Sequence, residues 1–181
     1  MKHALIFDTE TTGLIKNSAL PLEQQPHIIE FYGCIVDVDN GEIIADLDFI
    51  CNPGIPLETV ITKITGITDA DVANKPPFSE FESSVRQLIS RADTIAAHNL
   101  SFDWDMLCLE FRRCETIDSV KWPMTRICTV EETEYMKGHR LNLSKLHTLL
   151  FDEPFQGAHR ANVDVVALTR CFLELKKRGD I

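Results

Sequence analysis

The spacing of apolar residues changes along the chain, from the short runs typical of strands to the periodicity of helices. Three short runs rich in β-branched and aromatic residues predict strands over residues 3–8, 27–37 and 42–51. Asn40 and Gly41 lie between the second and third runs, and an Asn-Gly pair is a strong signal for a tight hairpin turn. We therefore expect these three strands to be neighbours, with two of them antiparallel.

After residue 77, apolar side chains recur mainly at helical spacing. The pattern predicts helices over residues 78–91, 101–113, 143–151 and 162–178, with short buried strands at 94–97 and 125–128. Ser101 is a suitable N-cap for the second of these helices, and Gly179 ends the last one. The segment 15–26 contains two prolines and is predicted to be a mobile loop. This order of elements predicts an α/β protein with a mixed sheet.

Length and composition are those of one globular domain, residues 1–181, with 44% hydrophobic and 25% charged residues. No apolar run approaches the roughly 18 residues that a membrane helix needs, so we expect no membrane association and a cytoplasmic location. The six cysteines form no C-x-x-C pair, which favours reduced core thiols over disulfides or a zinc site. The net charge of −10 argues against a passive nucleic-acid binder, unless some carboxylates serve to hold divalent cations.

The first candidate site is an acidic pair at the end of the first predicted strand. Side chains alternate along a strand, so Asp8 and Glu10 lie on one face, about 7 Å apart. Two carboxylates so close repel each other unless a cation lies between them, which is how hard divalent ions are held. Acidic pairs at strand ends are commonly just solvated, but the apolar residues 4–7 indicate a central, buried strand. The pair is therefore a candidate metal site.

The second candidate site, residues 98–103, follows a buried strand and opens a helix, where backbone N–H groups lack partners. A structural interpretation is also available. Ser101 can cap the helix while Asp103 complements its dipole, and His98 with Asn99 can form a hydrogen-bonded turn.

The third candidate site, residues 159–164, lies at the start of the last predicted helix. Asp164 falls in the first turn and His159 just before it, so both side chains can face the same cleft. A histidine in this position is commonly structural. Its ordinary pKa of about 6.5 nevertheless makes it a candidate for taking a proton from water.

Taken together and in this order, the three segments resemble the motifs of a known enzyme family. Residues 7–14 read FDTETTGL, residues 98–103 match the pattern HN-x-x-FD, and residues 159–164 match H-x-A-x-x-D. The set resembles the DEDDh, or DnaQ-like, branch of the DEDD superfamily of 3′–5′ exonucleases, which includes proofreading subunits of bacterial replicative polymerases. Connecting stretches such as 27–30 and 66–69 are similar too, so the resemblance covers essentially the whole chain.

The resemblance implies a ribonuclease-H-like fold, with a five-stranded mixed sheet and helices on both faces. It implies two Mg²⁺ or Mn²⁺ ions, one held by Asp8, Glu10 and Asp164, the other by Asp8 and Asp103. His159 would deprotonate the attacking water, and the products would be nucleoside 5′-monophosphates released from a 3′ end. The residues that the resemblance assigns to substrate binding are Thr11, Thr12, Gly13, Leu14, His98, Asn99 and Phe102.

The substrate class and partners are less defined by these motifs. The resemblance favours the 3′ ends of DNA, single-stranded or mismatched, over RNA. An RNA-trimming exoribonuclease of the same branch is the alternative, because no motif reveals the space beside a terminal 2′-hydroxyl. An inactive nucleic-acid-binding domain is an alternative of another class, against which the complete carboxylate set argues. The sequence given ends 17 residues after Asp164, without the polymerase-binding tail of the similar proofreading subunit, which leaves polymerase association open.

Overall fold

The computed structural model describes residues 2–17, 19–155 and 160–181. In this part of the chain, five strands form one mixed sheet in the order β3-β2-β1-β4-β5. β1 is antiparallel to β2 and β2 to β3, whereas β1 pairs in parallel with β4, and β4 with β5. The predicted mixed sheet with three neighbouring first strands is thereby confirmed. The strands are β1 (His3–Thr11), β2 (Ile28–Asp37), β3 (Ile43–Ile50), β4 (Thr94–Ala97) and β5 (Thr125–Cys128).

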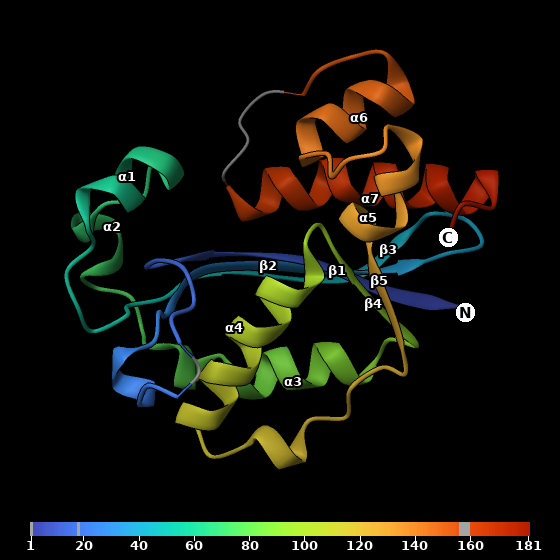
Figure 1. Ribbon diagram of the computed structural model, residues 1–181. Helices are drawn as coiled ribbons and strands as arrows, with labels where there is room; N and C mark the ends of the chain where they lie inside the picture. Colours follow the sequence, from blue (N-terminus) through green and yellow to red (C-terminus); the bar gives the residue numbers. More distant parts are fainter. Residues whose placement is uncertain (1, 18, 156–159) are drawn as a thin grey trace.

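Helices cover both faces of the sheet, as expected (Figure 1). α3 and α4 pack on the face that Leu5 and Phe7 share, and α6 and α7 pack on the face of Ala4 and Ile6. This alternation follows from the two-residue period of a strand. The helices of the described residues are α1 (Thr59–Thr65), α2 (Asp69–Val72), α3 (Glu82–Ser90), α4 (Leu100–Arg113), α5 (Thr129–Glu132), α6 (Leu143–Phe151) and α7 (Ala161–Arg178).

β1 is longer than predicted and continues to Thr11. It keeps its register with β2 as far as the pair Glu10 and Glu30, and the register shifts only between Glu10 and Thr11. Asp8 and Glu10 therefore both lie within the regular strand. Their two-residue separation holds them on the face that α7 covers.

The predicted N-cap of α4 is wrong by two residues. Asn99, not Ser101, precedes the helix, and its φ of 77° is in the left-handed region that asparagine tolerates better than most residues. The chain thus turns sharply straight after β4, and Ser101 is an exposed residue of the first turn. The two short helices α1 and α2 were not predicted, although Thr68 and Asp71 form a capping box at the start of α2.

The segment between β1 and β2, predicted to be mobile, is tied to the body of the protein. Arg113 of α4 donates Nη2 hydrogen bonds to the carbonyls of Leu22, Gln25 and Pro26, at 2.9 to 3.1 Å. Its Nη1 bonds Glu110, which is 3% exposed and also accepts from the amide of Ile28. Buried charges need such partners, so this pair fixes the loop against α4.

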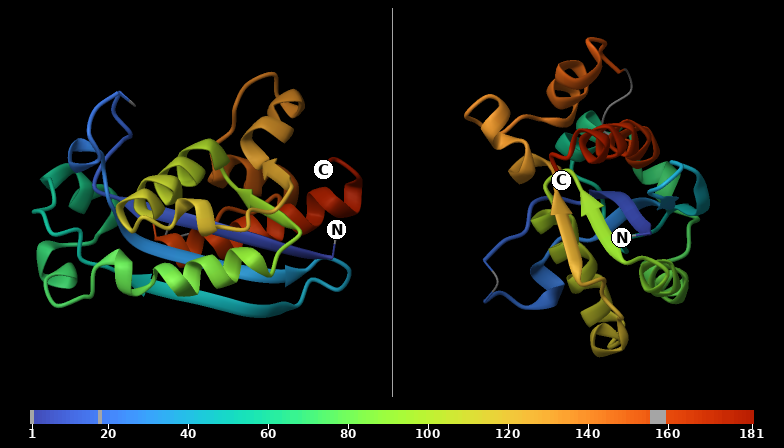
Figure 2. Two further views of the ribbon diagram at one scale, coloured as in Figure 1. Left: turned by 90° about the horizontal axis from the view of Figure 1, so that it is seen from below. Right: turned by 90° about the vertical axis from the view of Figure 1, so that its right-hand side faces the viewer.

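All six cysteines are free thiols, and four of them are buried, in agreement with the expectation. None of the helices in the described ranges is long and apolar enough to cross a bilayer. The two ends of the chain lie together, at the opposite end of the molecule from α1 and α2 (Figures 1 and 2).

Candidate active site

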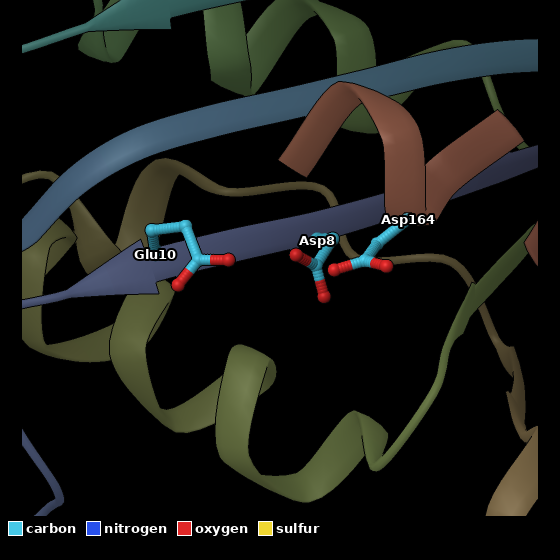
Figure 3. A group of neighbouring side chains, drawn as sticks. All are labelled: Asp8, Glu10 and Asp164. Carbon is cyan, nitrogen blue, oxygen red and sulfur yellow. The ribbon is translucent and has the colours of Figure 1, made fainter. Parts of the chain in front are cut away.

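Three carboxylates predicted from separate motifs meet over β1. Asp8 and Glu10 project from the strand, and Asp164 projects toward them from the first turn of α7 (Figure 3). One oxygen of each carboxylate lies within 4.8 Å of those of the other two. All three side chains are partly accessible to solvent. Hard divalent cations take oxygen ligands of this kind, so the donor set suits Mg²⁺ or Mn²⁺.

The electrostatics of the cluster show the strain of holding these charges together. Burial raises the pKa of Asp8 well above its ordinary range, and the nearby carboxylates Asp103, Glu10 and Asp164 raise it further. The pKa of Glu10 rises to about 8, first through burial and then through Asp164 and Glu30. A bound cation would oppose both pKa shifts, since it replaces repulsion between the carboxylates with attraction to the ion.

Asp103 occupies a different environment beside β1. β4 pairs with β1 only from Ala4 to Ile6, so the edge of β1 beyond that point has no strand partner. There the amide and hydroxyl of Thr9 donate to Oδ1 of Asp103, at 3.1 and 2.7 Å. Burial raises the pKa of Asp103 to about 7, while the bonds from Thr9 oppose the rise. Asp103 lies outside the group of three, although its charge acts on Asp8.

His98 connects the end of β4 to the neighbouring segments. Its Nδ1 lies 2.9 Å from Oγ1 of Thr129, and its Nε2 lies 3.1 Å from the carbonyl of Leu141. A carbonyl only accepts, so Nε2 carries the proton, and burial lowers the pKa of the ring to about 4. Both ring nitrogens are thus engaged within the protein. Asn99 forms the turn into α4, and Phe102 is partly buried against the core.

The segment from Thr11 to Leu14 leaves β1 next to the three carboxylates. The Thr11 hydroxyl donates to the carbonyl of Gly13, and the Thr12 hydroxyl accepts from the amide of His27. Leu14 is 80% exposed. It borders, together with Thr12 and Gly13, a groove of about 670 Å³ whose other wall is formed by α1.

Comparisons with known proteins identify the family of the chain. A family model described as Exonuclease (RNase_T) matches residues 5–172, which include the carboxylates of β1, α4 and α7. The chain belongs to this exonuclease family. The chain is also 34% identical, over 178 residues, to the DNA polymerase III PolC-type protein of Bacillus subtilis. The match covers 96% of this chain and 11% of that protein.

Solved structures of exonucleases share the fold. Exonuclease X, in complex with 5′ overhanging duplex DNA, is similar with a TM-score of 0.67 and 22% identity, over 97% of this chain and 93% of that one. The nuclease domain of 3′hExo, a DEDDh family member bound to rAMP, has a TM-score of 0.74 and 16% identity, covering 98% and 93%. The family model and the Bacillus subtilis relative confirm the expected exonuclease family, and these structures of DEDDh nucleases confirm the expected ribonuclease-H-like fold. Members of this family use divalent ions, which agrees with the acidic cluster of the exonuclease.

His159, the expected general base of the exonuclease, lies outside the described residues. Its role therefore stays a prediction. The described chain resumes at Arg160, directly before α7.

Sequence reasoning missed two groups of residues that support the exonuclease site. Thr9 stands between the two acidic residues of β1 and was overlooked because its own type carries no signal. Glu30 lies in the similar stretch 27–30 and Arg160 in the motif 159–164, but neither was expected to act at the site. A signal for Glu30 existed, because a single carboxylate inside the apolar run of β2 needs a buried partner.

Proposed function

We propose that the chain is a divalent-metal-dependent 3′–5′ exonuclease that removes nucleoside 5′-monophosphates from DNA, with single-stranded or mismatched ends preferred. The observation that carries the proposal is the meeting of Asp8, Glu10 and Asp164, with one oxygen of each within 4.8 Å. A close cluster of like charges destabilises a protein unless an opposite charge is bound between them. Binding of cations is the use that this donor set fits.

The carboxylates divide the binding of two ions between them. Asp8, Glu10 and Asp164 would hold one Mg²⁺ or Mn²⁺, and Asp8 with Asp103 a second. When bound, the ions supply positive charge to the phosphodiester group and its transition state. The part played by the protein is to hold the carboxylates in place, and the bonds from Thr9 orient Asp103 for this task.

Hydrolysis requires a proton to leave the attacking water. The oxygen of that water forms a bond to phosphorus while the bond from phosphorus to the 3′-oxygen breaks, and the 3′-oxygen then takes up a proton from solvent. His159 would accept the proton of the water as a general base. Replacement by alanine should slow the reaction by roughly 10²–10⁴-fold and leave metal binding intact, which calorimetric titration with Mn²⁺ would check. A near-normal rate for His159→Ala would show that another group takes the proton.

The terminal nucleotide would lie between the carboxylates and the groove that Leu14 borders, because residues 11–14 connect the two. Leu14 on one side and Val60 and Ile64 of α1 on the other expose apolar surface, at 80%, 51% and 50%. Exposed apolar side chains around a groove are typical of ligand sites, and bases present flat apolar faces. In this proposal Thr11, Thr12, Gly13 and Leu14 hold the last nucleotide, with Phe102, His98 and Asn99 shaping the pocket around it.

The choice of DNA over RNA rests on relatives. The 34% identity to a DNA polymerase and the DNA complex of exonuclease X support DNA. The nuclease domain solved with rAMP keeps the alternative of a ribonucleotide substrate open.

A panel of 5′-labelled substrates tests the proposal directly. Purified protein with Mg²⁺ is given single-stranded DNA, matched and mismatched duplexes, and RNA of the same sequence. We expect stepwise shortening from the 3′ end, fastest on single-stranded or mismatched DNA, and none with chelator or for Asp8→Asn. Cutting of a circular single strand at a comparable rate would contradict the exonuclease assignment. If RNA is shortened faster than DNA, RNA and not DNA is the preferred substrate.

A further inference from the structure

We infer that the ion pair between Glu30 and Arg160 is a positioning device, which holds the first turn of α7 so that Asp164 completes the metal site. Neither Glu30 nor Arg160 is one of the residues that would hold metal. The inference deepens the proposed function and rests on it. It follows from where the pair lies and from how the two residues are bonded.

Glu30 accepts several hydrogen bonds beside the site. It lies on β2 and is only 1% exposed. Nη2 of Arg160 donates to Oε1 at 2.7 Å, and Nε of Arg160 donates to both oxygens, at 3.0 and 3.2 Å. The backbone amide of Ala161, the first residue of α7, donates to Oε2 at 3.0 Å. Glu30 thus holds both a side chain and the backbone at the start of this helix.

The same two residues connect directly to the carboxylates of the site. Glu30 stands opposite Glu10 in the antiparallel pairing of β1 and β2, so both side chains lie on the face that α7 covers. The carbonyl of Arg160 accepts the amide of Asp164, at 3.0 Å, as the first bond of the helix. A chain of hydrogen bonds therefore runs from β2 through Arg160 to the backbone of Asp164. Rotation of this first turn would move the Asp164 carboxylate away from Asp8 and Glu10.

The cost of Glu30 supports a specific use. A fourth carboxylate beside Glu10 adds repulsion to a cluster that is already negative. The side chain of Arg160 is 45% exposed and could be solvated without Glu30. Glutamine would fill the same volume without the charge. A bidentate arginine contact supplies what glutamine does not, namely a fixed direction for the helix start.

Two effects of the pair can be separated by their sign. If its charges alone mattered, loss of negative Glu30 would weaken cation binding and loss of positive Arg160 would strengthen it. If the pair positions α7, both losses weaken binding, since each releases the helix start. Groups that orient metal ligands typically change metal affinity or activity by about 10–100-fold when they are replaced.

The experiment measures Mn²⁺ affinity by electron paramagnetic resonance of the free ion, together with kcat and KM on single-stranded DNA. Glu30→Gln and Arg160→Gln should each weaken Mn²⁺ binding by about tenfold or more and lower kcat, with KM for DNA little changed. Arg160→Lys, which keeps the charge but loses the two-pronged contact, should fall between the parent and Arg160→Gln. Glu82→Gln is the matched control, because Glu82 is a buried glutamate that binds Arg86 at 2.9 Å on α3. It should leave Mn²⁺ affinity and kcat unchanged.

Tighter Mn²⁺ binding by Arg160→Gln, or unchanged binding by both glutamine variants, would overturn the inference. Circular dichroism and thermal melting identify any variant that does not fold, and Arg160→Lys then carries the test because it retains both charges. If the parent releases mononucleotides and Glu30→Gln binds Mn²⁺ as tightly as the parent does, only the positioning role is contradicted. A parent that neither binds Mn²⁺ nor shortens DNA contradicts the proposed function itself.

Discussion

Asp103 and Asp164 are both aspartates in the first turn of a helix, yet the protein treats them differently. Asp103 meets the open edge of β1, where the amide and hydroxyl of Thr9 bind it. Asp164 meets the α7 face of the same strand, where Asp8 and Glu10 repel it. Asp103 is thus held by donors from Thr9, whereas an oxygen of Asp164 lies within 4.8 Å of two other carboxylates. Successive residues of β1 serve both purposes. The side chains of Asp8 and Glu10 point to the α7 face, whereas Thr9 between them donates to Asp103 at the edge of the strand.

The difference shows that burial and helix position alone do not fix the surroundings of a carboxylate. Burial raises the pKa of both Asp8 and Asp103. What distinguishes the α7 face is the close approach of three carboxylates, whose mutual repulsion a cation would offset. The edge at Thr9 compensates its carboxylate within the protein. Four experiments test this contrast.

The largest effect is expected for the loss of a carboxylate from the α7 face. Asp8→Asn should reduce the single-turnover rate by on the order of 10³-fold or more, because transition-state charge stabilisation worth several kcal/mol depends on the ions that Asp8 holds. Rapid-quench assays on labelled single-stranded DNA would measure it. The exposed Asp39→Asn is the matched control and should retain the parental rate. Equal rates for both variants would contradict the role of the α7 face.

Metal should stabilise the parent and relieve the repulsion between the carboxylates. At about a hundredfold over its dissociation constant, Mg²⁺ should add roughly 2.7 kcal/mol to the free energy of unfolding, or several degrees in Tm. Asp8→Asn should melt above the parent in chelator, since one charge is removed, and gain little from Mg²⁺. Thermal melts with chelator and with excess Mg²⁺ would measure both. A Mg²⁺-dependent rise in Tm as large in Asp8→Asn as in the parent would show that Asp8 takes no part in metal binding.

Protonation should relieve the repulsion between the carboxylates without metal, because a neutral carboxyl group carries no charge. The pKa of Glu10 rises from 4.5 to about 8 on folding, so the native state binds a proton more tightly than the unfolded chain does. In chelator, the contribution of Glu10 to stability is therefore present below pH 4.5 and is lost as pH rises to about 8. The Tm of the parent should fall more steeply between pH 5 and 8 than that of Glu10→Gln. Parallel curves would contradict the shift.

The smallest effect is expected at the open edge of β1. Thr9→Val removes the hydroxyl donor to Asp103 and leaves the amide donor, so it should cost about 1 kcal/mol in the free energy of unfolding. Thr9→Ser should restore most of that loss. Unlike Asp8→Asn, Thr9→Val should destabilise the protein in chelator. Urea unfolding in chelator would measure it, and a more stable Thr9→Val would show that the Thr9 hydroxyl does not stabilise Asp103.

Local patterns predicted the sheet and the shared face of Asp8 and Glu10, because strand period acts over a few residues, whereas only the resemblance joined Asp164 to this pair. Resemblance added the family and the base His159. The environment of Asp103 could not be predicted, since it depends on where β4 ends relative to β1. Glu30 and Arg160 were missed for a similar reason, because their contact joins residues 130 positions apart. The Ser101 cap failed because Asn99 adopted a left-handed conformation that no spacing reveals.

The placement of Asp164 on α7 has a consequence for the folding of the chain. Glu10 and Asp164 stand 154 positions apart, so the site closes a loop that contains most of the chain. Until α7 docks on Ile6 through Leu168 and Phe172, only the carboxylates of β1 and α4 are in place. Any partly unfolded form that releases α7 therefore removes Asp164 from the site. Opening of this one helix would make the nuclease inactive before it becomes unfolded, and bound ions would oppose that opening as a cross-link between the first strand and the last helix.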